Sequence, residues 1–479
     1  MTSTLTLASL APAIPEIYLT VALCVILLVD AFAGQASRRL TPTLTLAALV
    51  IGAALTARYA DVSSSVTLFS GMYVADPLGN MLKLFAFLFI AVSLLYSRHY
   101  LDARGLLKGE YYVLTLSALL GICVMISAGS LLSMYMGIEL LSLSLYALVA
   151  FNRDSGIAAE SAIKYFVLGA IASGCLLYGM SLVYGMSGSL LFSDIAEALR
   201  GVPSLGLIMG LVFLVVGVAF KFGAVPFHMW VPDVYHGAPS SVTLLIASAP
   251  KIGSFALAYR LLVEALGGVA TSWMQMLTII AVLSLFLGNV VAVAQTNMKR
   301  LLAYSAIGNV GFILLGFVAG SEQGVEAALF YTLAYIITTL GALGVVLLAS
   351  PAGFEADHFD HYKGLHARDP MLALAMMVMM FSVGGMPLFV GFWAKLQIFQ
   401  ALWAVNATEL VVIAALISVV GLYYCLRVIK LMYFDAPGDF PRSTCGTAER
   451  GVLLVNAAIV VALGLLPNTL LSLCEAVIG

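Results

Sequence analysis

Six ionisable residues lie inside segments that are otherwise apolar enough to cross a lipid bilayer. They are five lysines and one glutamate, Lys83, Lys164, Lys221, Lys251, Lys395 and Glu139. A charged side chain at bilayer depth costs at least ~2.5–3.5 kcal/mol on insertion scales, so such residues face the protein interior or water, pair with one another, and tend to mark ion pathways. Amines and a carboxylate distributed through membrane segments therefore predict a path for protons.

The composition defines the class of protein. The chain is 62% hydrophobic and 10% charged, against about 25% charged residues in an average soluble domain, and its mean hydropathy is +1.07. These values predict a polytopic membrane protein surrounded by membrane lipids. The net charge of −2 and the lack of a basic run give no indication of nucleic acid binding.

The sequence offers little for a metal or a cofactor. The cysteines are scattered, without the close spacing of iron–sulfur or zinc sites. No two histidines face each other inside predicted membrane segments, as heme ligation would require. One group does resemble a metal-binding cluster, but it lies in a charged loop, where a solvated surface is the favoured interpretation. Its members are Asp357, His358, Asp360, His361 and His366. We expect neither a metal nor a cofactor in this chain.

Windows of ~20 apolar residues predict fourteen transmembrane helices in an all-α protein. The first segment lacks a basic residue before it, so we interpret it as a helix and not as a signal peptide. The expected limits are 13–33, 41–58, 77–97, 110–128, 131–151, 160–186, 203–231, 240–263, 272–295, 300–319, 325–349, 371–404, 408–433 and 450–474.

The loops predict the orientation of the chain. Loops after the odd-numbered segments hold fourteen Lys and Arg residues, among them Lys299 and Arg300, whereas those after even-numbered segments hold only Arg58, Arg200 and Arg260. Under the positive-inside rule the first group is cytoplasmic. Both termini are then expected in the periplasm.

An internal repeat is also present. Gly223-Ala224-Val225-Pro226 recurs 161 residues later as Gly384-Gly385-Met386-Pro387, and residues 160–165 resemble residues 326–331 at a spacing of 166. The offsets nearly agree and equate two sets of five helices. Because five is odd, the copies must be inverted, an arrangement typical of transporters. The expected organisation is N-terminal helices in 1–109, a first repeat in 110–265, an inverted second repeat in 266–434, and a C-terminal helix in 435–479.

The segments 203–231 and 371–404 are too long for single straight spans. Fully helical, they would measure about 43 and 51 Å, against a hydrocarbon core of about 30 Å. Proline removes an amide donor and glycine permits an unwound link, so both helices are expected to break at Gly-x-x-Pro. The break residues are Gly223, Pro226, Gly384 and Pro387. Carbonyl groups freed there need protein or water partners.

Simpler interpretations apply to some of the charged residues. Lys83 follows Asp76 and Pro77 at a helix start, so its amine is expected to extend to the lipid headgroups, and Lys164 could do the same. Glu139 and Lys251 lie deep in their segments. For these two the alternative to proton transfer is a static ion pair that holds helices together.

The run from Lys221 to Pro239, KFGAVPFHMWVPDVYHGAP, resembles the signature of the antiporter-like subunits of respiratory complex I, the NADH:quinone oxidoreductase. Residues 164–173, residues 297–307 and Gly391–Lys395 support the resemblance, which spans nearly the whole chain. The N-type subunit is the most similar. M-type relatives carry a glutamate where this chain has Lys395, and L-type relatives have further C-terminal helices.

The resemblance implies roles for particular residues. It assigns proton transfer to a Glu139–Lys221 pair, to Lys251 as the central relay, and to Lys395 at the distal end, and we add Lys164 and His228 as further relay candidates. Water and Ser, Thr or Tyr hydroxyls would bridge the gaps, at positions that the sequence does not give.

The resemblance also implies an assembly in a bacterial plasma (inner) membrane. FMN, iron–sulfur clusters, NADH and quinone would bind to partner subunits, and the neighbours would be the antiporter-like M and L types and the small K and J types. The alternatives are a subunit of an Mrp-type cation/proton antiporter or of a related membrane-bound hydrogenase, and an inert scaffold.

Overall fold

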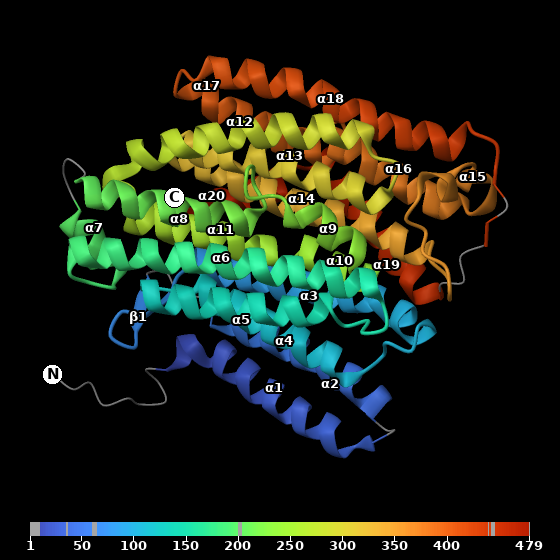
Figure 1. Ribbon diagram of the computed structural model, residues 1–479, viewed down its shortest axis with the longest axis horizontal. Helices are drawn as coiled ribbons and strands as arrows, with labels where there is room; N and C mark the ends of the chain where they lie inside the picture. The colour runs from blue at the N-terminus through green and yellow to red at the C-terminus, as the bar shows by residue number, and fades with distance from the viewer. Residues whose placement is uncertain are drawn as a thin grey trace.

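The protein is a bundle of long helices that lie side by side along the longest axis of the molecule (Figure 1). The computed structural model describes residues 10–34, 37–59, 65–199, 204–438, 440–441 and 446–478. Within these ranges, thirteen helices are long and apolar enough to cross a membrane. The prediction of an all-α polytopic membrane protein is confirmed.

The first half of the chain keeps the predicted order of spans. Its helices are α1 (Ile14–Phe32), α2 (Ser37–Arg58), α3 (Pro77–Ala103), α4 (Gly109–Ile126), α5 (Leu131–Val149), α6 (Gly156–Ser187), α7 (Phe192–Ala198), α8 (Leu205–Phe222), α9 (Trp230–Gly237), α10 (Ser240–Ala247) and α11 (Pro250–Ala258). A π-helical turn, Tyr259–Ala265, continues α11.

The second half contains α12 (Ala270–Ala294), α13 (Met298–Val318), α14 (Glu322–Leu348), α15 (Leu365–Arg368), α16 (Pro370–Gly384), α17 (Val390–Ala404), α18 (Thr408–Tyr433), α19 (Thr447–Leu465) and α20 (Asn468–Ile478). Short 3₁₀ turns lie at Ala11–Ala13, Gly267–Val269 and Phe359–Tyr362.

The loops gather at the two ends of the bundle. Strands β1 (Val66–Leu68) and β2 (Tyr73–Ala75) form an antiparallel hairpin near α7 at one end, and α15 lies at the other (Figure 1). A bridge between Ser130 and Leu191 joins the start of α5 to the segment before α7, and one between Asn297 and His358 ties together two loops of the α15 end. The loops after the ninth and eleventh predicted spans therefore share one end.

Both predicted helix breaks are present. Helix α8 ends at Phe222 and α9 begins only at Trp230, while α16 ends at Gly384 and α17 begins at Val390. Gly223 has φ +77° and so occupies the left-handed region that favours glycine. In the second break this residue is Gly385, with φ +82°, while Gly384 is still helical.

Two further interruptions were not predicted. The segment expected as one helix at 240–263 is divided between α10 and α11 at Ser248–Ala249, where Pro250 starts the new helix. The C-terminal segment expected as one helix at 450–474 is divided between α19 and α20, with Pro467 in the gap. In both cases proline cannot donate the amide that a continuing helix needs.

Close contact between α4 and α5 depends on Gly121. A Cβ atom there would lie 2.6 Å from the Leu141 nitrogen and 2.9 Å from the Gly137 oxygen, which are backbone atoms of the helix that carries Glu139. We expect Gly121→Ala to destabilise the protein by about 1–3 kcal/mol, as overpacked cores do. Gly174→Ala is the control, because no atom lies within 4 Å of its added Cβ. Thermal unfolding of the purified complex measures both, and equal stability of the two variants would contradict the packing argument.

Candidate proton-transfer site

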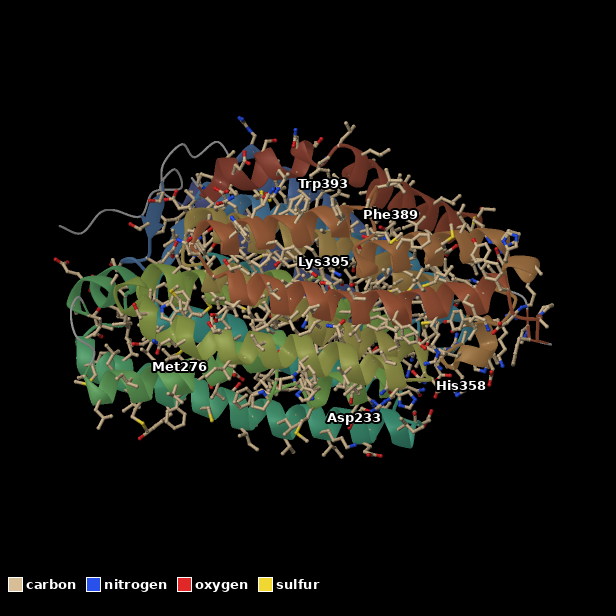
Figure 2. The ribbon with its side chains drawn as sticks, turned by 90° about the horizontal axis from the view of Figure 1, so that it is seen from above. Asp233, Met276, His358, Phe389, Trp393 and Lys395 are labelled. Atoms are coloured by element: carbon tan, nitrogen blue, oxygen red, sulfur yellow. The ribbon has the colours of Figure 1, made fainter. Side chains whose placement is uncertain are left out.

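Two buried lysines bind the carbonyl groups that the helix breaks leave free. Lys251 Nζ donates to the Phe222 carbonyl at 2.7 Å, and Lys395 Nζ donates to the Gly384 carbonyl at 3.0 Å. These carbonyls belong to the last residues of α8 and α16, so they have no partner within their helices. An ammonium group at a helix C-terminus is also favoured by the helix dipole. Figure 2 shows Lys395 near mid-length of the molecule, inside the bundle.

The Lys221 amine lies beside α5 and does not contact Glu139. Its Nζ donates to the Ser142 hydroxyl at 2.5 Å. Among the described residues no ion pair joins Glu139 to Lys221, and Glu139 Oε1 is buried without a hydrogen-bond partner. Ser142 is three residues after Glu139 on α5, so the two lie on one face of the helix. The Lys221 amine thus contacts a neutral hydroxyl, and the Glu139 carboxylate lies on the same face of α5 as that hydroxyl.

Lys164 and His228 occupy different settings. The Lys164 side chain is 45% exposed and pairs with Glu160 at 2.8 Å and with Asp233 at 2.9 Å. Asp233 also pairs with Arg300 at 3.0 Å, which joins α6, α9 and α13. His228 lies in the loop of the first break with a buried, unpartnered Nδ1. Lys164 is therefore part of a surface ion-pair network, whereas His228 belongs to the unwound segment.

Polar side chains surround the second break. The Ser382 hydroxyl lies 3.1 Å from that of Thr338 and accepts the Gly391 amide at 3.2 Å. Beside them is a cavity of about 10 Å³, near the minimum for one water molecule. Its lining includes Tyr335, whose buried hydroxyl has no partner. The break is thus suited to hold a water molecule.

The interpretation of Lys83 as a residue that reaches the headgroups is wrong. Lys83 is 1% exposed and forms an ion pair of 2.5 Å with Glu16 on α1. The Tyr73 hydroxyl accepts from Lys83 at 3.1 Å and donates to Glu16 at 3.0 Å. Sequence reasoning missed Glu16, which stands near the start of the first predicted span. The signal that could have identified Glu16 is its position, as a charged residue, inside that predicted span.

Two residues counted as loop charges are also buried. Lys299 belongs to the first turn of α13, is 3% exposed, and donates to the Ala238 carbonyl at 3.2 Å. Arg260 is 2% exposed in the π-helical turn and pairs with Asp76 and Glu264, at 2.6 Å each. Residues at the ends of predicted spans can turn inward when a partner is available, which a count of loop charges ignores.

The described residues contain no group of three or more side chains placed to hold a metal ion. In the loop that resembles a metal-binding cluster in the sequence, Asp357 accepts from Asn297 at 3.0 Å and lies 3.7 Å from His236. Burial favours a higher pKa for Asp357, but the nearby His236 side chain and the charge of Lys299 outweigh it and lower the pKa to about 2. The Asp357 carboxylate therefore already has partners among neighbouring side chains. Figure 2 shows His358 toward one end of the molecule.

The buried Glu16–Lys83 pair leads to a stability prediction. Lys83→Met leaves the Glu16 carboxylate buried without its cation, so it should destabilise the protein by about 3–5 kcal/mol. Adding Glu16→Gln should recover part of this loss, because no unpaired charge then remains. Lys430→Met is the control, since that side chain is 66% exposed. Denaturant unfolding of purified complexes measures these three and Glu16→Gln alone, and strictly additive effects of the two single changes would contradict direct pairing.

The sequence and the fold have close relatives. The family described as NADH:quinone oxidoreductase/Mrp antiporter, transmembrane part, matches residues 128–421. The NADH-quinone oxidoreductase subunit N of Thiobacillus denitrificans is 51% identical, covering 100% of this chain and 99% of that protein. Subunit N of Herminiimonas arsenicoxydans is 49% identical, with 98% of each chain covered.

Solved structures agree with these relatives. A chain of respiratory complex I from Thermus thermophilus is 31% identical and superposes with a TM-score of 0.82, covering 96% of this chain and 98% of that one. A chain of the Mrp complex from Dietzia superposes with a TM-score of 0.85 over 98% of this chain and 97% of that one, but at 19% identity it shows a shared fold alone. The chain thus belongs to the subunit N family of the NADH-quinone oxidoreductases, within the NADH:quinone oxidoreductase/Mrp antiporter family.

Proposed function

We propose that this chain translocates protons in the membrane arm of NADH:quinone oxidoreductase, through half-channels joined by Glu139, Lys221, Lys251 and Lys395. The observation that carries the proposal is the contact of Lys251 and Lys395 with freed helix carbonyls in the interior of the bundle. A buried amine can release its proton more readily than one in water, because desolvation disfavours the charged form. The carbonyl would hold the amine in place in both its protonated and its neutral form.

In the proposed path, Lys221 and Glu139 form the pair whose contact changes. The amine now contacts Ser142, while Glu139 keeps an unpartnered oxygen. Movement of Lys221 toward Glu139 would favour the ammonium form, and return to Ser142 would favour proton release. Ser254 of α11 donates to the Lys221 carbonyl at 3.1 Å and so connects this helix end to the helix that carries Lys251.

The assignment of residues 110–265 and 266–434 as inverted repeats belongs to the same proposal. The two similar breaks, each adjoined by a lysine, support it. In the proposed orientation the end of the bundle with α15 faces the cytoplasm of a bacterial cell, and both termini face the periplasm. His228, in the first break, is an additional relay candidate, and Lys164 with its surface pairs is a weaker one.

The assembly would supply the redox chemistry. FMN, iron–sulfur clusters, NADH and quinone are assigned to partner subunits, and the membrane neighbours to the M, L, K and J types. An Mrp-type antiporter or a hydrogenase subunit is not favoured, because the relatives identical at about half of all positions are named subunit N. The driving change would reach this chain as a movement or a change in charge at a subunit interface.

Arginine separates a proton carrier from a structural cation. It keeps the positive charge, but its pKa above about 12 prevents proton release. We expect complexes with Lys221→Arg or Lys251→Arg to assemble and to lose most of their proton pumping. Lys430→Arg, at an exposed position, is the matched control. NADH-driven proton uptake into vesicles, normalised to assembled complex, measures the effect. Full pumping by both Lys221→Arg and Lys251→Arg would refute the carrier role.

Glu139 should act through its charge. Glu139→Gln removes the charge with little change in volume, so we expect weaker pumping at normal assembly, and Glu139→Asp should retain part of the activity. Glu110→Gln serves as the control, because that residue is exposed in the first turn of α4. The same vesicle assay applies. Pumping at the wild-type rate in Glu139→Gln would remove Glu139 from the mechanism.

A further inference from the structure

The amines of Lys251 and Lys395 each lie over an aromatic ring as well as beside a freed carbonyl. Lys251 Nζ is 6.0 Å from the centroid of the Trp230 ring, and Lys395 Nζ is 5.4 Å from that of Phe312. These distances are within the range of cation–π attraction, in which the electron-rich face of a ring stabilises a cation. Each amine therefore contacts two neutral groups, the carbonyl and the ring.

The interior of the bundle increases the importance of these rings. The two lysines and the two rings, Lys251, Lys395, Trp230 and Phe312, are all buried. An ammonium group has three N–H donors, but among the described residues each amine has one hydrogen-bond acceptor, its carbonyl, and no carboxylate within ion-pair distance. A cation–π contact is stronger where water is excluded. The ring thus supplies a favourable electrostatic contact that no second acceptor provides.

A tyrosine stacks on each of the two rings. The centroids of the Tyr165 and Trp230 rings are 4.5 Å apart with 16° between the ring planes, and those of Tyr331 and Phe312 are 5.5 Å apart with 13° between the planes. Both tyrosines are buried. Near-parallel aromatic pairs at such distances are favourable. Stacking therefore fixes the plane of the ring over which each lysine lies.

The two tyrosines occupy equivalent positions in the internal repeat. Residues 160–165 resemble residues 326–331, and Tyr165 and Tyr331 are the last residues of these segments. The rings that they support come from different elements, since Trp230 begins α9 and Phe312 lies in α13. Sequence similarity between the two segments therefore does not account for both rings. Their shared feature is a stacked ring placed beside a lysine at a helix break.

Trp230 also connects the two sides of the first break. Its indole Nε1 donates to the Phe220 carbonyl at 3.2 Å, near the end of α8, while Trp230 itself is the first residue of α9. The Lys251 amine binds the carbonyl of Phe222, the last residue of α8. The same side chain therefore holds α9 against the end of α8 and lies beside the amine that is bound there.

We propose that Trp230 and Phe312 are positioning residues whose ring faces stabilise the ammonium forms of the two lysines at the helix breaks. A carboxylate in the same place would become an unpaired buried charge whenever the lysine lost its proton, which is costly. A ring carries no net charge, so the lysine can lose its proton without that cost. The inference rests on the proposed function and adds the groups that set how readily each lysine holds its proton.

Replacing each ring tests the proposal, and each variant is the control of the other. Trp230→Leu keeps an apolar side chain but removes the ring beside Lys251, so the ratio of ammonium to neutral amine at Lys251 should fall about tenfold. The ratio at Lys395 should not change. Phe312→Leu should have the reverse effect, and Trp230→Phe, which keeps a ring, should retain most of the Lys251 ratio.

Solid-state NMR of ¹⁵N-labelled lysine in the assembled complex measures these ratios. Each signal is assigned by its loss in the arginine variant of that lysine, and each ratio is read at the pH where the wild type shows both forms. Trp273→Leu is a further control, because this buried indole donates to the Leu266 carbonyl at 3.0 Å, whereas among the described residues no lysine lies over its ring. It should leave both ratios unchanged.

A fluorinated tryptophan at position 230 alone separates the ring face from the shape of the side chain. It keeps the indole N–H and nearly the same shape, but fluorine withdraws electrons from the ring face, so the Lys251 ratio should fall again. A merely structural role of Trp230 would leave this ratio unchanged, because the packing and the hydrogen bond to the Phe220 carbonyl are both retained.

The outcomes distinguish this inference from the proposed function. Unchanged Lys251 ratios in Trp230→Leu and in the fluorinated complex would overturn it, as would a fall of equal size in Trp273→Leu. If Lys251→Arg has lost pumping in the same preparations, the proposed function stands and only the role of the rings fails. If Lys251→Arg pumps fully, the proposed function fails, while the ratios at rest still decide whether the rings stabilise the ammonium forms.

Discussion

The structure depends on the need to satisfy every backbone carbonyl inside a membrane. Where α8 and α16 end within the bundle, their last carbonyls have neither a helical partner nor bulk water. Lys251 and Lys395 supply the missing donors. Each break and its lysine therefore stabilise each other. Without the amine, the freed carbonyl would be buried without a donor. Without the carbonyl, the amine would be buried without an acceptor.

The same constraint connects stability to mechanism. Elsewhere the protein buries charge in ion pairs, such as Glu16 with Lys83 and Arg260 with Asp76. Lys251 and Lys395 differ because their recorded partners are neutral carbonyls. A neutral partner can bind an ammonium and tolerates its deprotonation better than a carboxylate would. In the proposed mechanism, the buried lysines thus divide into structural cations and proton carriers according to the groups that they contact.

Much of this architecture could be predicted from the sequence, because its causes are local. Apolar runs predict the membrane spans, and the Gly-x-x-Pro motifs predict both long breaks. Glycine and proline change the conformation of the backbone at their own positions, so this effect can be predicted from the local sequence. Lys83 was misjudged because its partner, Glu16, belongs to a different helix.

The central claim is that Lys251 changes its protonation state during turnover while its amine remains at the Phe222 carbonyl. Solid-state NMR of the complex with ¹⁵N-labelled lysine, assigned by the loss of a signal in Lys251→Arg, measures this directly. Under conditions of sustained turnover, the Lys251 Nζ resonance should divide between an ammonium and a neutral amine population. A single ammonium signal for Lys251, identical at rest and in turnover, would contradict the claim and make this lysine a structural cap of α8.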